Sequence, residues 1–446
     1  MSIEREVAAV LGHVSRDRLL GAVAGVVDIA SPTGGEGVLA RWLVDRMGTA
    51  GLRAVEQRID GRQSNAVGVL AGGKGPSVLL YAPIDTFTTG DSAYDVPGAA
   101  ALLTPDMLPR ATVHGDLVEG LGAGNPKGHA ACVLVAVEAL AAAGVELAGD
   151  VVAGFGAGGM PAFAHDDRAG RSNTGHGVGA TFLVERGFTT DHAVIAKPGW
   201  QVSHEEVGLV WLDVVVPGIH TYVGSRHRLP YRNAVALAGE VAIRLERWFE
   251  EYAERHETGT LRPQGIVSSV RGGLDHLAAA TPAEVRLRLD VRLTPEQTPA
   301  TVTRAVRTFL DGVGRELDTS LTVTQVAAVP ASRTAPGADV VRATIAAWEA
   351  VAGETHRPAT GNSGATDANI LRLRGLPTAR VGMPKVAVGP DGRPPDFTRG
   401  MNLVDLREAR RLVEVLVRTV LLLQRSAPGG GAGAPDGPAR APAARQ

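Results

Sequence analysis

Short apolar runs and helically spaced apolar residues alternate along the first half of the chain. The clearest run covers residues 78–81, with Gly-Lys-Gly-Pro shortly before it and Pro-Ile-Asp-Thr shortly after it. A run of this kind predicts a fully buried strand. Because ligands of open α/β sheets bind at the carboxyl ends of strands, we expect Asp85 to face a surface crevice. The alternative is a turn carboxylate that caps backbone or pairs with Lys127 or Lys197.

The remaining pattern predicts helices and strands around this central strand. Residues 36–47 place apolar side chains on one helical stripe. The helix expected at 126–143 follows Asn125, which suits the N-cap, and its positive end would face the Asp85 crevice. Residues 90–115 are expected to form an irregular loop. The other expected helices are 17–30, 180–186, 338–352 and 404–423, and the other expected strands are 53–59, 65–71, 151–155, 193–196 and 378–381.

The order of elements changes near residue 207. From there, a strand, a long helix, two strands, a helix and a strand follow one another as βαββαβ, which predicts a ferredoxin-like sandwich. We therefore predict an α/β protein with a discontinuous main domain, residues 1–206 and 329–425, and a lid domain, residues 207–328. The tail, residues 426–446, is rich in Gly, Ala, Pro and Arg and is predicted to be disordered.

Composition narrows the class of protein. A net charge of -2 over 446 residues provides no basic excess for nucleic-acid binding. The single cysteine, Cys132, excludes an internal disulfide and fits a reducing cytoplasm. No apolar run reaches the roughly 18 residues of a membrane span, and the first residues lack a signal-peptide pattern. We therefore expect a soluble, cytoplasmic protein with neither nucleic acid nor a membrane as partner.

Four short motifs resemble those of a known family in their order and spacing. They are Ser-Pro-Thr-Gly-Gly-Glu at 31–36, Gly-Leu-Gly-Ala-Gly-Asn-Pro-Lys-Gly at 120–128, Asp-Val-Arg at 290–292 and Gly-Ala-Thr-Asp-Ala at 364–368. The family is that of zinc-dependent aminoacylases, succinyl-diaminopimelate desuccinylase, acetylornithine deacetylase and glutamate carboxypeptidase. The resemblance covers residues 3–423. It implies a zinc-exopeptidase-like α/β sandwich domain with an inserted ferredoxin-like lid, through which two copies form a homodimer.

The resemblance also implies where two zinc ions would be bound, and most of these positions have changed. Asp85 is retained, but no His lies near residues 396–400, where the distal His ligand is expected. The remaining ligand and general-base positions are occupied by Pro83, Asn125, Gly159, Met160 and Lys197. A zinc site needs about four deprotonated ligands. We therefore expect no bound metal and no cofactor.

Lys197 changes the charge of this crevice. An ammonium group where a carboxylate faced a metal ion repels cations and partly replaces the lost positive charge. Asn125, Gly159 and Met160 remove negative charge in the same direction. Lys197 could therefore stabilise an anionic substrate or an oxyanion. A plain salt bridge to Asp85 is the alternative.

Residues of the lid and of a later loop complete the predicted site. In the resembling enzymes, a His of the lid reaches the neighbouring subunit's active site and polarises the scissile carbonyl. Tyr222 takes that position here, and His220, two residues earlier, shares its face on an extended chain. An ordinary lid loop is the alternative for both. The predicted substrate-binding residues are Asn125, Arg226, Asn362, Ser363 and Thr366.

Other histidines are weaker candidates. His204 and Glu206 would share one face of a strand and could hold a metal only with further ligands. His165 and His176 lie in a Gly-containing loop and are expected to be exposed rather than catalytic.

These observations lead to one functional hypothesis and two alternatives. The hypothesis is a metal-independent enzyme, with Asp85, Lys197, Tyr222 and His220 as catalytic groups, that acts on an amide or N-acyl-amino-acid-like small molecule. The reaction would be hydrolysis, acyl transfer, amide formation or cyclisation, in a specialised biosynthetic pathway. The first alternative is a catalytically silent binding or regulatory protein. The second is a zinc hydrolase with displaced ligands.

Overall fold

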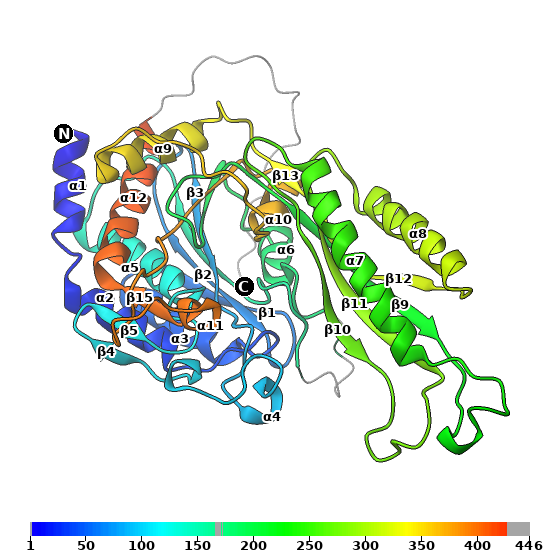
Figure 1. Cartoon of the computed structure of the whole chain (residues 1–446). Coiled ribbons are helices and arrows are strands. Elements are labelled where there is room, and N and C mark those ends of the chain that lie inside the picture. Colours follow the sequence, from blue (N-terminus) through cyan, green and yellow to red (C-terminus); the bar gives the residue numbers. More distant parts are fainter. Residues whose placement is uncertain (1, 166–170, 172, 426–446) are drawn as a thin grey trace.

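The computed structural model describes residues 2–165, 171 and 173–425; the tail predicted to be disordered lies outside this range. A six-stranded sheet forms the centre of the larger unit, in the order β1-β2-β6-β3-β7-β14 (Figure 1). Strands β6, β3, β7 and β14 run parallel, and β1 and β2 are antiparallel to their neighbours. The strands are β1 Arg53–Arg58, β2 Ser64–Leu70, β3 Val78–Pro83, β6 Val151–Gly156, β7 His192–Ala196 and β14 Thr378–Val381.

Helices cover both faces of this sheet. One face shares its core with α1 (Ile3–Leu11), α2 (Arg16–Val27), α3 (Gly37–Thr49), α5 (Lys127–Ala143), α9 (Asp339–Ala352) and α12 (Leu406–Arg425). The opposite face packs against α6 (Val178–Glu185) and α10 (Ala368–Leu373), which lie between the sheet and the second unit (Figure 1). Both β3 and β6 are buried along their whole length, as expected for strands in a parallel sheet between helical layers.

The second unit has the predicted ferredoxin-like order. Its antiparallel sheet runs β10-β11-β9-β12, so the first strand in sequence lies between the third and the fourth. Two amphipathic helices share one core with this sheet, and Trp248 stacks on Phe309 between them, with 5.4 Å between ring centroids. The elements are β9 Gly208–Pro217, α7 Ala234–His256, β10 Gly265–Arg271, β11 Glu284–Leu293, α8 Pro299–Glu316 and β12 Thr322–Val329.

Short elements differ from the predictions. The segment expected to be an irregular loop contains α4 (Ser92–Asp95), a 3-10 helix (Pro105–Met107) and strand β4 (Thr112–His114). Strand β4 pairs with β5 (Leu117–Glu119), which pairs with β15 (Leu403–Asp405), so the last helix begins two residues later than predicted. The remaining elements are β8 Glu205–Glu206, β13 Ser332–Arg333, the 3-10 helix Val223–Ser225 and α11 Phe397–Met401. None of the helices described is long and apolar enough to span a membrane.

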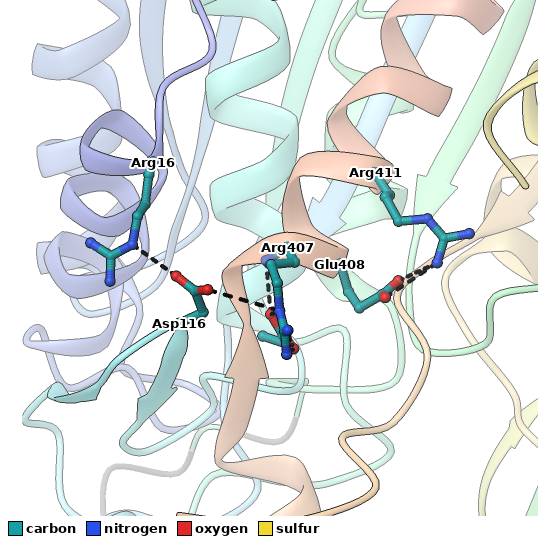
Figure 2. Close-up of polar contacts among 6 residues, drawn as sticks. Arg16, Asp116, Arg407, Glu408 and Arg411 are labelled. Atoms are coloured by element: carbon teal, nitrogen blue, oxygen red, sulfur yellow. Dashed lines mark hydrogen bonds and ion pairs between the residues drawn. The ribbon is translucent and has the colours of Figure 1, made fainter.

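Ion pairs occur both on the surface of the helical layer and beneath it. On the surface, Arg16 bonds Asp116 at 2.8 Å, and Glu408 pairs with Arg411 at 2.9 Å (Figure 2). Beneath it, the buried Glu138 of α5 accepts from Arg46 of α3 at 2.7 Å and from Arg18 of α2 at 3.2 Å. Because water competes much less for Glu138, its pairs should contribute more to stability than the pairs on the surface.

We expect Glu138→Gln to lower the free energy of unfolding by about 1–3 kcal/mol, because two guanidinium groups lose a buried negative charge and one of its two acceptor oxygens. Glu408→Gln is the matched control, and loss of its surface pair should cost less than about 1 kcal/mol. Urea unfolding of both variants measures the difference. Equal losses would show that burial does not decide the strength of these pairs.

Candidate functional site

The carboxyl ends of four parallel strands meet at one edge of the large sheet. Asp85 follows β3, Met160 follows β6, Lys197 follows β7 and Met383 follows β14. Neighbouring parallel strands end at the same edge, so the fold brings together residues up to 298 positions apart, from Asp85 to Met383 (383 − 85). Asp85 therefore lies at the predicted sheet edge, but it is fully buried.

Asp85 holds the end of the neighbouring strand. Its Oδ1 accepts from the Gly159 N–H at 2.8 Å, and its Oδ2 accepts from the Met160 N–H at 3.0 Å and the Thr33 hydroxyl at 2.7 Å. Burial raises the pKa of Asp85, while these bonds and the charge of Lys197 act in the opposite direction. Lys127 does not pair with it, since its Nζ donates to the Ile29 carbonyl at 2.6 Å.

Lys197 lies in the middle of this edge and is almost wholly buried. Its Nζ donates to Asn125 Oδ1 at 3.3 Å and lies 3.5 Å from Met160 Sδ. No oxygen of Asp85 comes within the 4.0 Å of a direct ion pair, so the plain salt bridge between them is not formed. Burial lowers the pKa of Lys197, and the nearby carboxylates of Asp367 and Asp85 partly oppose this.

Asn125 differs from its predicted role as helix cap. Helix α5 begins at Lys127 with Pro126 at the N-cap position, and no side chain caps it. The Asn125 amide instead receives the Lys197 bond, and its Nδ2 lies 3.6 Å from Met401 Sδ. Tertiary contacts with the ammonium thus override the local preference of Asn for an N-cap.

Two further carboxyl groups are buried close to Asp85. Asp367 Oδ2 accepts from the fully buried Tyr81 hydroxyl at 2.6 Å, and burial raises the pKa of Asp367 to about 6. Glu36 Oε1 accepts from the N–H groups of Gly34 and Gly158 at 3.0 and 2.8 Å. Burial, and then the charge of Asp85, raises the pKa of Glu36 to about 8. This edge of the sheet therefore contains buried carboxyl groups, those of Asp85, Asp367 and Glu36, near the ammonium group of Lys197.

The residues present do not fit a paired metal site. A β-carbon added at Gly159 would overlap Pro83 and lie 2.5 Å from Asp367 Oδ2, so a Glu cannot occupy this position without rearrangement. Lys197 presents a cation, and Asn125 and Met160 are neutral. Across the described residues, no three His, Cys, Asp or Glu side chains gather in a way that could hold a metal ion.

The loop predicted to contact substrate is bonded to its surroundings. Thr366 donates from its backbone and its hydroxyl to Glu206, at 3.1 and 2.5 Å, and Arg380 pairs with the same carboxylate at 2.8 Å. The Asn362 carbonyl accepts from the backbone of Arg262, and Ser363 Oγ accepts from that of Gln264. These contacts join the loop to the segment before β10; a substrate-binding role for the loop stays a prediction.

A cavity of about 370 Å³ opens beside Asn125. Its wall is mainly apolar, with Met383, Phe397 and Met401 among the lining residues. The charged lining residues are Lys385, Asp396 and Asp405. We call it the Asn125 cavity. A mainly apolar cavity with a few polar groups is typical of a small-molecule site.

The lid residues of the predicted site lie elsewhere within one chain. Tyr222 is 60% exposed, and His220 Nδ1 lies 2.8 Å from the Thr281 carbonyl oxygen. Arg226 stacks on the ring of Tyr231. All of them follow β9, at the end of the four-stranded sheet that points away from β3 and α5 (Figure 1). The chain by itself therefore does not bring them to Lys197.

Sequence reasoning missed several buried polar residues of this edge. His129 Nε2 accepts from the Met383 N–H at 3.1 Å, and burial lowers the pKa of His129 to about 3. Glu36 and Asp367 stand in motifs that were identified, but their sequence gave no sign of burial. His176, expected to be exposed, is largely buried against Phe163 and Trp211. His204 and Glu206 do not converge on a common ligand, because their side chains bond Thr334 and Arg380.

Known proteins share the fold of this chain. No family model matches the sequence. Human carnosine dipeptidase 1 superposes with a TM-score of 0.67 at 15% identity, over 95% of this chain and 99% of that one. Aminopeptidase PepT from Bacillus cereus gives 0.61 at 17%, over 92% and 100%, and an M20 family metallo-carboxypeptidase from Sulfolobus solfataricus gives 0.63 at 14%, over 91% and 99%. These similarities confirm the predicted fold class.

Glu36 should make stability depend on pH. The folded protein retains a proton up to a pKa of about 8, whereas an unfolded chain releases it near the ordinary value of 4.5. Stability from this group is therefore complete below pH 4.5 and is lost as the pH rises through 8. Glu36→Gln, which resembles the protonated acid, should remove this decline. Urea unfolding of both proteins across this range measures it; parallel curves would contradict the assignment.

Proposed function

We propose that this protein binds an amide- or N-acyl-amino-acid-like small molecule in the Asn125 cavity and acts on it without a paired metal centre. The observation that most supports this proposal is the hydrogen bond from Lys197 Nζ to Oδ1 of Asn125, a residue that lines the cavity. The Lys197 ammonium lies behind the lining residue Asn125, near Asp85, which occupies the position of a zinc ligand in the resembling enzymes. The amidohydrolase origin rests on the shared fold and on the motif order.

The contact with Lys197 gives Asn125 its role in this proposal. A charge-assisted bond to the amide oxygen polarises the amide and makes its N–H groups stronger donors. In a dry cavity such a donor can bind the carbonyl or carboxylate oxygen of a ligand and stabilise negative charge that develops there. Lys385, on the same wall, can attract a carboxylate. The two carboxylates that also line the cavity already accept hydrogen bonds, Asp396 from the Arg399 N–H and Asp405 from the Arg407 guanidinium group. Together, Asn125 and Lys385 favour a ligand with a carbonyl group and an acid group.

The remaining predicted residues enter this proposal with different roles. Asp85 orients the loop after β6 through two hydrogen bonds, from the Gly159 and Met160 N–H groups, and keeps Met160 against the ammonium. Tyr222, His220 and Arg226 would act in the site of a second copy of the chain, as the resemblance implies. Asn362, Ser363 and Thr366 would contact the polar end of the ligand when the lid separates from them.

One observation favours a second candidate, a catalytically silent binding or regulatory protein. Both oxygens of Asp85 are already bonded, and Pro83, Gly159 and Met160 supply no acid or base. The two candidates share the ligand and the cavity. They differ in whether the bound molecule is converted.

We expect Lys197→Met to weaken the binding of N-acetyl amino acids at least tenfold, which is about 1.4 kcal/mol, because the polarising charge is removed. Asn125→Leu should have a similar effect, since it removes the donor itself. Lys74→Met, on the exposed surface, is the matched control and should bind normally. Calorimetric titration measures binding, and mass spectrometry of the mixture detects conversion. Unchanged binding by both site variants would contradict the proposal.

Elemental analysis of the purified protein tests separately the proposal that the protein acts without a bound metal. We expect substoichiometric zinc, cobalt and manganese, and binding that a chelator does not change. Stoichiometric metal, together with loss of binding after chelation, would instead support a zinc hydrolase with displaced ligands.

Mixing two inactive variants tests the proposed dimer. If Tyr222 and His220 serve the neighbouring chain, a dimer of one Lys197→Met chain and one Tyr222→Ala/His220→Ala chain retains one complete site. We expect such mixtures to regain up to about a quarter of the wild-type conversion under random assembly, since half of the dimers are mixed and each has one of two sites. Sedimentation analysis tests whether the chains form a dimer. No recovery from mixed dimers, with wild-type chains active, would contradict a role across the interface.

A further inference from the structure

The apolar wall of the Asn125 cavity has a buried part that is fixed from behind. Met383 is only 4% exposed; its N–H donates to His129 Nε2 at 3.1 Å, and its Sδ lies 4.0 Å from Cys132 Sγ. The Met401 carbonyl accepts from the Asn125 N–H at 2.9 Å. Both methionines are thus held at their backbones beside the amide of Asn125, while their unbranched side chains can adapt to the shape of a ligand.

Phe397 forms the exposed part of the same wall. It is the first residue of α11, and 72% of it is exposed. The helix is anchored, because the Asp396 side chain accepts from the Arg399 N–H at 2.8 Å and Arg399 Nε donates to Glu119 at 2.8 Å. A single exposed apolar side chain is ordinary on a protein surface. Phe397 differs because it lines a cavity, so a ligand in that cavity can remove its ring from water.

Polarity changes along the segment that follows β14. Lys385 lies two residues after the buried Met383, is exposed, and forms no ion pair with any residue that the structure describes. Both residues line the Asn125 cavity. The buried end of the cavity is therefore apolar, and its exposed side carries an ammonium group. A ligand that matches this arrangement turns an apolar group inward and a carboxylate towards Lys385.

The size of the cavity favours a ligand that is larger than a carbonyl and an acid group alone. Its volume is about 370 Å³, whereas one water molecule needs only roughly 10–15 Å³. A small polar ligand would leave much of the apolar wall in contact with water. Release of that water by an apolar group is favourable, and the gain grows with the apolar area that leaves water.

We propose that Met383, Met401 and Phe397 form an apolar subsite that selects ligands with a large apolar group, such as a phenyl ring, next to a carboxylate. The apolar group belongs either to the amino-acid side chain or to the acyl group of an N-acyl amino acid. The subsite deepens the proposed function by naming the class of ligand, and only the amide of that ligand rests on the proposed function. Phe397 determines specificity, because it is the part of the wall that a ligand covers.

Calorimetric titration with three probes tests the subsite and separates the two sources of the apolar group. N-acetylphenylalanine carries a phenyl ring on the amino-acid side, its isomer N-(3-phenylpropanoyl)glycine carries the ring on the acyl side, and N-acetylglycine has none. We expect one or both isomers to bind at least tenfold more tightly than N-acetylglycine, because the ring leaves water. The tighter isomer identifies the end that enters the subsite. Two isomers that bind no more tightly than N-acetylglycine would overturn the proposal.

Substitutions at Phe397 test its role in this preference. Phe397→Ala should weaken binding of the tighter isomer about fivefold or more and leave N-acetylglycine unaffected, whereas Phe397→Leu should retain most of the preference. Ile243→Ala in α7 is the matched control, since it truncates a side chain that is 53% exposed and does not line the cavity. Thermal unfolding shows whether each variant is folded. A folded Phe397→Ala protein with an unchanged preference would overturn the proposal.

A fourth probe, 4-phenylbutanoate, separates this inference from the proposed function, because it has the ring and the carboxylate but no amide. If it binds as tightly as the amide probes and Phe397→Ala weakens it, the apolar subsite is supported and the amide part of the proposed function fails. If Asn125→Leu weakens the amide probes but the ring brings no advantage, the proposed function stands and the apolar subsite is refuted. Absence of binding by all four probes would refute both.

Discussion

The buried ammonium group of Lys197 is the constraint on which the rest of this site depends. A cation enclosed by protein must be compensated by acceptors and nearby negative charge, since desolvation otherwise lowers its pKa until it loses its proton. Asn125 supplies the acceptor, and Asp367 and Asp85 supply the charge. The same ammonium explains why Asn125 points into the site rather than capping α5. An ammonium group at this position would also repel divalent cations.

The residues around Lys197 also pack closely against one another. With glycine at position 159, Pro83 and Asp367 approach the loop after β6, and the backbone of that loop binds Asp85. Asp367 in turn holds Tyr81 beneath the sheet edge. Each of these residues therefore fits the packing of the next.

Sequence patterns were most informative where one physical rule dominates. Apolar runs located β3, β6 and β7, because strands between two helical layers are buried on both faces. The βαββαβ order of the lid was equally readable, and motif spacing placed Lys197 after β7. Predictions from these patterns were wrong where contacts between distant parts of the chain determine the local structure. Strand β4 consists of three exposed residues, and they form a strand only because they pair with β5. His176 is covered by the ring of Trp211 in β9, 35 residues later in the chain (211 − 176).

The sequence by itself determined the order of elements, the fold class and the identity of the groups at the positions where the resemblance implies zinc ligands. These follow from local periodicity and from residue type, which need no coordinates. Only the tertiary structure decided which groups touch. Asp85 bonds backbone and a hydroxyl instead of a lysine, Lys197 reaches an amide, and Tyr222 lies far from both within one chain. Such pairings depend on how strands and loops distant in sequence pack together, and that geometry is a property of the whole fold rather than of any segment.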